Sequence, residues 1–233
     1  MTAVVAVGAA LTATAKLHTR TKVVRTRFRL LDAIARYRLV FQNPRAVVCY
    51  GTVFVEGIAI YGIVPFVGDL LESHHAGGPR EAGFVIAGLG LGGIVFSVLV
   101  SPTVRLLGTF GMMRWGGVMA ALGLCGLMLQ ATWPLWASAF SLIGFGFFML
   151  HNSLQTKATE LAPTARGSAI ALHAFFFFLG QAIGPVIFGL ELSHLEVTMT
   201  LAVQAMTIAA AGFVSAHLLK RADQQQGLRS QTV

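Results

Sequence analysis

One acidic residue of this sequence, Glu56, lies inside a long apolar stretch, where an ionisable side chain is costly. In an α-helix that begins at position 46, Glu56 would lie about 15 Å deep, near the middle of a membrane. We interpret it as a candidate for proton coupling or substrate contact. The alternative is a protonated or paired acid that only supports the structure. Thr52 lies one helical turn earlier on the same face and is expected to hydrogen-bond Glu56.

Several other polar side chains also lie in apolar stretches. A lone histidine or glutamine in a membrane more often bonds a neighbouring helix than a ligand, so these are weaker candidates for a polar cavity. They are Asn152, Gln155, His173, Gln181 and Gln204, with His151 beside the first. The sequence has no metalloprotease histidine pair, nucleophile elbow or phosphate-binding glycine loop. We therefore expect no catalytic site, no metal and no cofactor.

The composition indicates which elements position these side chains. Hydrophobic residues make up 55% of the 233 residues and charged residues 11%, whereas soluble domains carry about 25% charged residues. A membrane-crossing helix needs about 20 mostly apolar residues. Suitable stretches cover residues 46–70, 82–104, 115–156, 167–190 and 197–219, and the third is long enough for two crossings divided near Pro134. The sequence predicts an all-α membrane protein with a bundle of six transmembrane helices.

Basic residues are concentrated in residues 16–45, whose charge equals the net charge of +8 of the whole chain. Placing this segment in the cytoplasm puts 16 of the 17 Lys and Arg residues on that side and Arg80 alone outside. Both ends of the six-helix block are then cytoplasmic, and the protein is expected in the plasma or inner membrane. Anionic lipid headgroups are the expected partner of the basic segment. Binding to nucleic acid is disfavoured because no soluble domain accompanies it.

The chain divides into four predicted regions. Residues 1–15 span about 22 Å as a helix, less than a membrane core of about 30 Å, and are interpreted as the end of a preceding transmembrane helix. Residues 16–45 form a basic cytoplasmic linker, in which the pattern of residues 28–41 predicts an amphipathic helix along the membrane surface. Residues 46–219 are the six-helix domain, and residues 220–233 a polar cytoplasmic tail.

Small residues form a packing motif in the fifth predicted span, at Gly180, Gly184, Pro185 and Gly189. Glycines four residues apart let a neighbouring helix approach closely, and proline removes one backbone donor. We interpret the motif as a helix-packing groove, with a kinked, rearranging helix as the functional alternative. A loop motif, comprising Arg105, Gly108 and Arg114, follows the second span.

The order of these features resembles the carboxy-terminal half of a major facilitator superfamily transporter, from the end of helix six through helix twelve. Residues 101–108 resemble the second, degenerate copy of the family's Gly-x-x-x-Asp-Arg-x-Gly loop, although Val104 stands where that motif has Asp. Residues 160–167 resemble the loop between helices ten and eleven. Residues 180–189 resemble the glycine–proline motif of helix eleven.

The resemblance implies secondary active transport of a small molecule by alternating access. Efflux by an antiporter is favoured over uptake because similar glycine–proline motifs recur in exporters. The resemblance also implies a partner that completes the pathway in the lipid bilayer, either a missing amino-terminal six-helix half or a second copy. A non-transporting membrane scaffold or assembly protein is the alternative.

Overall fold

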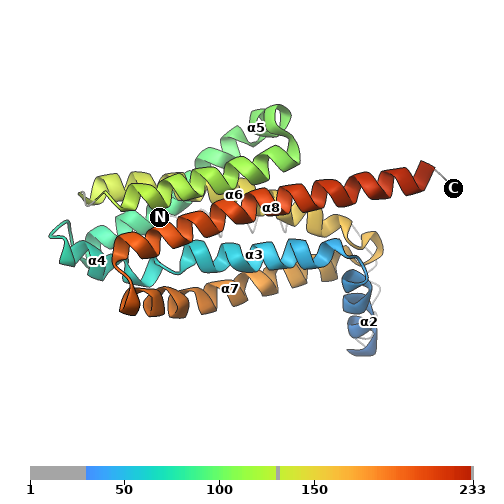
Figure 1. Cartoon of the computed structure of the whole chain (residues 1–233), viewed down its shortest axis with the longest axis horizontal. Helices are drawn as coiled ribbons and strands as arrows, with labels where there is room; N and C mark the ends of the chain where they lie inside the picture. The colour runs from blue at the N-terminus through green and yellow to red at the C-terminus, as the bar shows by residue number, and fades with distance from the viewer. Residues whose placement is uncertain (1–29, 130–131, 232–233) are drawn as a thin grey trace, which may run out of the picture. The chain divides into compact units, whose positions relative to one another are not determined.

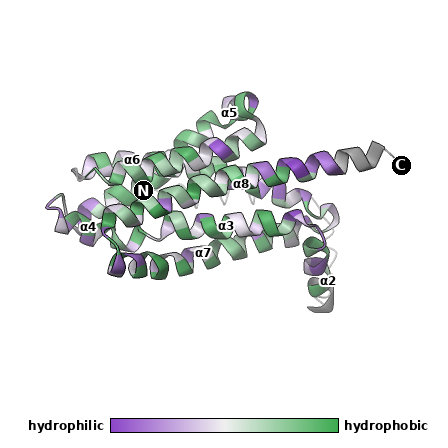
Figure 2. Ribbon diagram, in the orientation of Figure 1, coloured by the Kyte–Doolittle hydropathy of each residue, from purple (hydrophilic) through white to green (hydrophobic). Residues whose placement is uncertain are grey.

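The computed structural model describes residues 30–129 and 132–231, and every regular element in these ranges is a helix (Figure 1). Five of these helices are long and apolar enough to cross a membrane, which confirms the predicted all-α membrane fold. Apolar residues predominate along α3, α6 and α7, whereas hydrophilic residues gather towards the end of α8 (Figure 2). The helices are α2 (Leu30–Phe41), α3 (Arg45–Tyr61), η1 (Val64–Phe66), α4 (Val67–Ser73), α5 (Pro79–Leu127), α6 (Trp133–Glu160), η2 (Pro163–Ala165), α7 (Arg166–His194) and α8 (Val197–Gln231).

The 49-residue helix α5 supplies two crossings. At 1.5 Å per residue its chain would extend about 73 Å, more than twice a membrane core of about 30 Å. Gly108 interrupts it with φ +62° and ψ 173°, a backbone conformation that glycine adopts readily. The break lies between the second and third spans predicted from the sequence.

The two halves of α5 pass α6 in opposite directions. In the first half, contacts advance along α6 as the chain advances, and in the second half they retreat. The pairs are Gly88 with Ala137 and Gly92 with Ser141 in the first half, and Gly116 with Gly146 and Gly123 with Ala139 in the second half. The chain therefore reverses between the halves, so the five long helices make six crossings.

Close backbone contacts at glycines hold the helices together. A Cβ atom at Gly57 of α3 would lie 2.6 Å from the carbonyl oxygen of Phe177 in α7. A Cβ at Gly117 of α5 would lie 2.8 Å from the carbonyl oxygen of Ile208 in α8. Lipid tails are as apolar as leucine, so helices in a membrane gain from such close packing rather than from leaving water.

The glycine–proline motif of α7 faces α3. Gly180 lies against the carbonyl oxygen of Phe54, and a Cβ at Gly184 would lie 3.0 Å from that of Ile58. Gly189 meets the ring of Phe66. Pro185 lies inside α7, which continues through it to His194.

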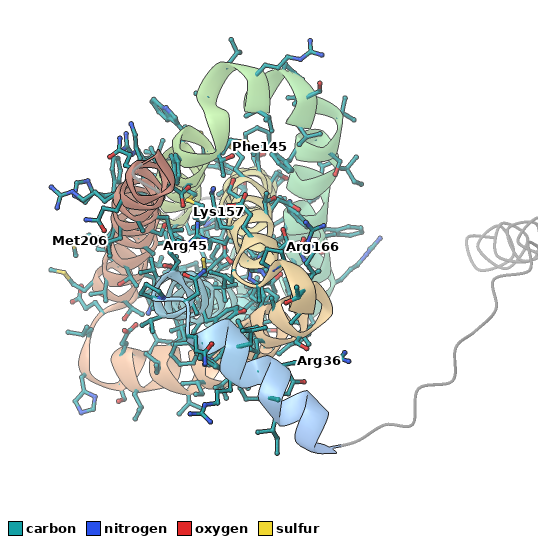
Figure 3. All side chains as sticks on the ribbon, turned by 90° about the vertical axis from the view of Figure 1, so that its right-hand side faces the viewer. Arg36, Arg45, Phe145, Lys157, Arg166 and Met206 are labelled. Carbon is teal, nitrogen blue, oxygen red and sulfur yellow. The ribbon has the colours of Figure 1, made fainter. Side chains whose placement is uncertain are left out.

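Ion pairs connect three helices at the end of the bundle where α3 begins and α6 ends. Asp223 of α8 accepts from Arg45 Nη1 at 2.6 Å and from Lys157 Nζ at 2.8 Å. Lys157 also contacts Glu160 at 2.8 Å. Figure 3 shows Arg45 and Lys157 lying close together between α3, α6 and α8. We call Arg45, Lys157 and Asp223 the charged clamp. Asp223 belongs to the predicted polar tail, in which α8 continues to Gln231.

The helix predicted at residues 28–41 corresponds to α2. Ile34, Leu39 and Phe41 of this helix are exposed, whereas Val40 is buried. The predicted stub at residues 1–15 and the first part of the predicted basic linker, residues 16–29, lie outside the described residues.

The packing around two nearby glycines of α5 predicts that replacing each by alanine has a different effect on the stability of the protein. At Gly92 a Cβ would overlap the carbonyl oxygen of Ser141, whereas at Gly90 no atom lies within 4 Å. Gly92→Ala should therefore cost about 1–3 kcal/mol of stability by overpacking, and Gly90→Ala should not destabilise. Thermal unfolding of the two detergent-purified variants measures this, and equal unfolding temperatures would contradict the packing.

Candidate functional site

Glu56 is fully buried and pairs with a histidine from another helix. Its side chain in α3 is 0% exposed, and Oε2 lies 2.8 Å from His151 Nδ1 in α6. Its other oxygen, Oε1, has no hydrogen-bond partner among the described residues. Removing one partner of a buried charge pair costs about 3–5 kcal/mol, so Glu56 is stable here as a neutral acid or as an ion paired with protonated His151.

His173 of α7 extends this pair to three titratable side chains from three helices. Its Nε2 lies 3.4 Å from His151 Nε2, which is long for a hydrogen bond. His173 is buried, and its Nδ1 has no partner in the described part of the chain. We call Glu56, His151 and His173 the proton chain, because all three side chains can gain or lose a proton.

The Glu56–His151 hydrogen bond can point in either direction. With Glu56 ionised and His151 protonated, His151 Nδ1 donates to the carboxylate. With Glu56 protonated and His151 neutral, the carboxyl group donates to Nδ1. The two arrangements hold the same number of protons and differ in which residue carries one of them. A proton can therefore move between Glu56 and His151 without movement of the backbone, while His173 contacts the other ring nitrogen of His151 at 3.4 Å.

Aromatic rings surround the middle of the proton chain. The centroids of Phe147 and Phe177 lie 4.9 and 4.7 Å from that of His151, and the ring of Tyr61 contacts both phenylalanines. These rings exclude water from the sides of the cluster. The side chain of His151 retains 16% exposure where that of Glu56 has none. His151 is therefore the member of the pair that water or a substrate can reach.

Thr52 is not brought to Glu56. It lines an open hollow of about 390 Å³ between α3 and α8, together with Thr207 and Val214. No hydrogen bond joins Thr52 to Glu56 in the structure as described, and Glu56 Oε2 is instead engaged by His151.

Two of the remaining polar candidates are engaged elsewhere. The Asn152 amide donates to the carbonyl oxygen of Phe148 at 2.7 Å and lines a separate cavity of about 450 Å³. The Gln204 amide donates to Glu191 at 2.7 Å and thereby joins α8 to α7. Gln155 and Gln181 are half-buried. His173 contacts the Glu56–His151 pair directly, and the side chain of Gln181 hydrogen-bonds Tyr61, whose ring lies against Phe147 and Phe177.

His151, which the sequence analysis named only as a neighbour of Asn152, is the residue that contacts Glu56. A usable signal is its depth, measured from the end of the bundle that carries the charged clamp. At 1.5 Å per residue, Glu56, His151 and His173 lie about 16, 14 and 10 Å along their helices from that end. Side chains at similar depth can come into contact. Whether they do depends on which face of each helix points into the bundle, and the sequence alone does not give these rotations.

Comparison with known proteins identifies the family. Residues 1–185 match the model of the Major Facilitator Superfamily, and the chain belongs to this family of multi-pass membrane transporters. It is similar to the uncharacterized MFS-type transporter YfkF of Bacillus subtilis (strain 168), with 29% identity over 135 residues. The match covers 57% of this chain and 34% of the relative, so the matched region spans about a third of that protein's length.

Direct contact between Glu56 and His151 predicts that their contributions to stability are not additive. Glu56→Gln and His151→Asn should each destabilise the protein, and the double variant should lose less than the sum of the two. The expected coupling is about 0.5–3 kcal/mol. It is measured by denaturant unfolding in detergent. As a control, Glu191→Gln combined with His151→Asn should be additive. Additivity in the first pair would show that the contact contributes nothing.

Proposed function

We propose that this chain forms one six-helix half of a secondary transporter that exports a small molecule by alternating access in exchange for protons. The observation that carries the proposal is the proton chain, which puts a buried carboxyl group and two histidines inside a membrane bundle. An ionisable group at such a depth is expensive to maintain and is by default functional. Membership of a transporter family supports the same conclusion.

Protonation of Glu56 supplies the coupling in this proposal. An ionised Glu56 attracts a protonated His151 and holds α3 against α6, whereas a neutral Glu56 retains only a hydrogen bond. The strength of the contact between the two helices therefore depends on the proton. Opening the site to one side of the membrane and then to the other would let it load and release that proton on opposite sides. His151, which is partly exposed, is the route by which a substrate or water molecule affects Glu56.

Export is favoured over uptake by the glycine–proline motif of α7, which resembles that of exporters in this family. A transport pathway needs walls from two six-helix units. We propose that an amino-terminal half or a second copy of the chain supplies the other wall. The family relative is about three times as long as the region matched to it, which fits a second unit.

We further propose that both ends of the six-helix block lie in the cytoplasm and that the bundle resides in the plasma or inner membrane. The distribution of Lys and Arg between the loops supports this orientation. The charged clamp would then mark the cytoplasmic end, and the loop between α4 and α5 would be outside.

The orientation can be tested with an impermeant thiol reagent on intact cells. In a background without Cys49 and Cys125, a single cysteine at Ala76 should be labelled and one at Thr159 should not. Both positions are half-buried, so the two sites are matched in accessibility. Permeabilised cells, in which both should react, provide the control. Labelling at 159 but not at 76 in intact cells would reverse the orientation.

Glu56→Gln tests proton coupling because it keeps the size of the side chain and removes its titration. In the full-length protein, with a substrate found by transport screening, this variant should lose proton-driven transport. Substrate binding and substrate–substrate exchange should remain, because they do not require net proton movement. His151→Gln should shift the pH profile of transport, since it removes the route to Glu56.

Glu191→Gln is the matched control for this experiment. It makes the same chemical change at an acid bonded to Gln204, away from the proton chain, and should keep the normal pH dependence. If Glu56→Gln also transports with its normal pH dependence, Glu56 is not the coupling residue and its role is structural or in substrate contact.

A further inference from the structure

A second site lies on the outer surface of the bundle, between α8 and the second half of α5. It is an open groove of about 520 Å³ lined by Arg114, Phe213, Val214, His217 and Leu218. Figure 3 shows that α8 faces outward here, since its Met206 points away from the other helices. No residue of the proton chain contributes to this groove.

The lining of the groove combines exposed apolar side chains with basic ones. Phe213, Val214 and Leu218 are 50%, 54% and 42% exposed, so the groove is open to the lipid. Arg114 and His217 stand beside them, and no acidic residue is among the lining residues. Arg221 follows His217 by one helical turn and lies on the same face of α8.

The nearest acid on α8 does not neutralise this basic group. Asp223 has both of its carboxylate oxygens engaged in the charged clamp, by Arg45 and by Lys157. It lies on a different side of α8, because six residues from His217 correspond to about 240° of helical rotation. The positive charge of the groove is therefore available to a ligand.

We propose that this groove binds an anionic phospholipid, with its phosphate against Arg114 and His217 and an acyl chain against Phe213 and Val214. Arginine presents a planar set of donors that matches phosphate geometry, and basic pockets between helices at the cytoplasmic surface of a membrane bind anionic headgroups. The site is independent of the proton chain and of transport.

The shape of the surface distinguishes a lipid from a soluble anion. Val214 also lines the hollow of about 390 Å³ between α3 and α8 that includes Thr207. Thr207 lies about 15 Å along α8 from His217, towards the middle of the crossing. An apolar track thus leads from the basic residues into the membrane. A free phosphate would use only the basic end of this track, whereas a lipid uses all of it.

The test is photo-crosslinking of the full-length protein in phosphatidylcholine vesicles that contain a minor fraction of phosphatidylglycerol with a diazirine in its acyl chain. Mass spectrometry of the digested protein should find crosslinks in residues 207–218 of α8. A phosphatidylcholine probe with the same diazirine should label these residues about tenfold more weakly, because its choline group puts a positive charge beside Arg114 and leaves the headgroup with no net charge.

Arg114→Gln should reduce labelling by phosphatidylglycerol by a similar factor, and Arg114→Lys should restore part of it. Arg166→Gln is the matched control, because Arg166 is an exposed arginine at the start of α7, outside the groove. It should label as the unmodified protein does, and elution of each variant as a single species verifies folding.

Two results would overturn the proposal. Equal labelling by the two lipids, or unchanged labelling of Arg114→Gln, would show that the groove does not recognise negative charge. Loss of labelling when inorganic phosphate or glycerol 3-phosphate is added would show that it holds a soluble anion instead of a lipid.

Discussion

The close contact between α3 and α7 at Gly57 and Gly180 is the constraint on which the proposed site depends. A Cβ at Gly57 would lie 2.6 Å from the carbonyl oxygen of Phe177, so these backbones approach as near as glycine allows. Glu56 is the residue next to Gly57, and His173 lies one turn before Phe177. The glycine contact therefore brings the acid and a histidine into the same layer, where both are buried. A buried carboxyl group needs a polar partner within the protein, and for Glu56 that partner is His151.

The acidic side chains at the end of the bundle and in its interior have different kinds of partner. At the end where α3 begins, Asp223 meets two permanently positive side chains, and the charged clamp is stable without any titration near neutral pH. Deeper in the bundle, the carboxyl group of Glu56 meets the imidazole of His151, which can exist as a neutral or a protonated ring. An arginine in place of His151 would keep both members of the pair charged. With a histidine, the proton can lie on either residue, and the proposed proton coupling requires such a change of protonation.

The sequence was sufficient for features that depend on composition and local spacing. Long apolar runs predicted the membrane helices, and the isolated position of Glu56 predicted a buried acid. Contacts between distant segments were not predictable, because they depend on how each helix is rotated. Thr52 shares a helix face with Glu56 in spacing yet lines a hollow towards α8, while His151, 95 residues away in sequence, reaches it. Asp223 appeared to be part of a polar tail, and its role in the charged clamp required the positions of α3 and α6.

In the proposed mechanism, these interactions influence which helices move relative to one another. The charged clamp joins α3, α6 and α8 at one end by two hydrogen bonds of 2.6 and 2.8 Å. The α3–α7 interface combines close glycine contacts with side chains that cross it, since Tyr50 donates to the carbonyl oxygen of Ala169 at 3.0 Å and stacks on Phe176. Pro185 lies within this interface and lacks the donor that would stiffen α7 there. Within the proposed mechanism, a movement of α7 relative to α6 would carry His173 away from His151. It would break the proton chain at its longest contact, 3.4 Å, while the Glu56–His151 pair stays intact. The proton would then remain on the pair while the helices rearrange, which a coupled exchange needs in order to avoid a leak.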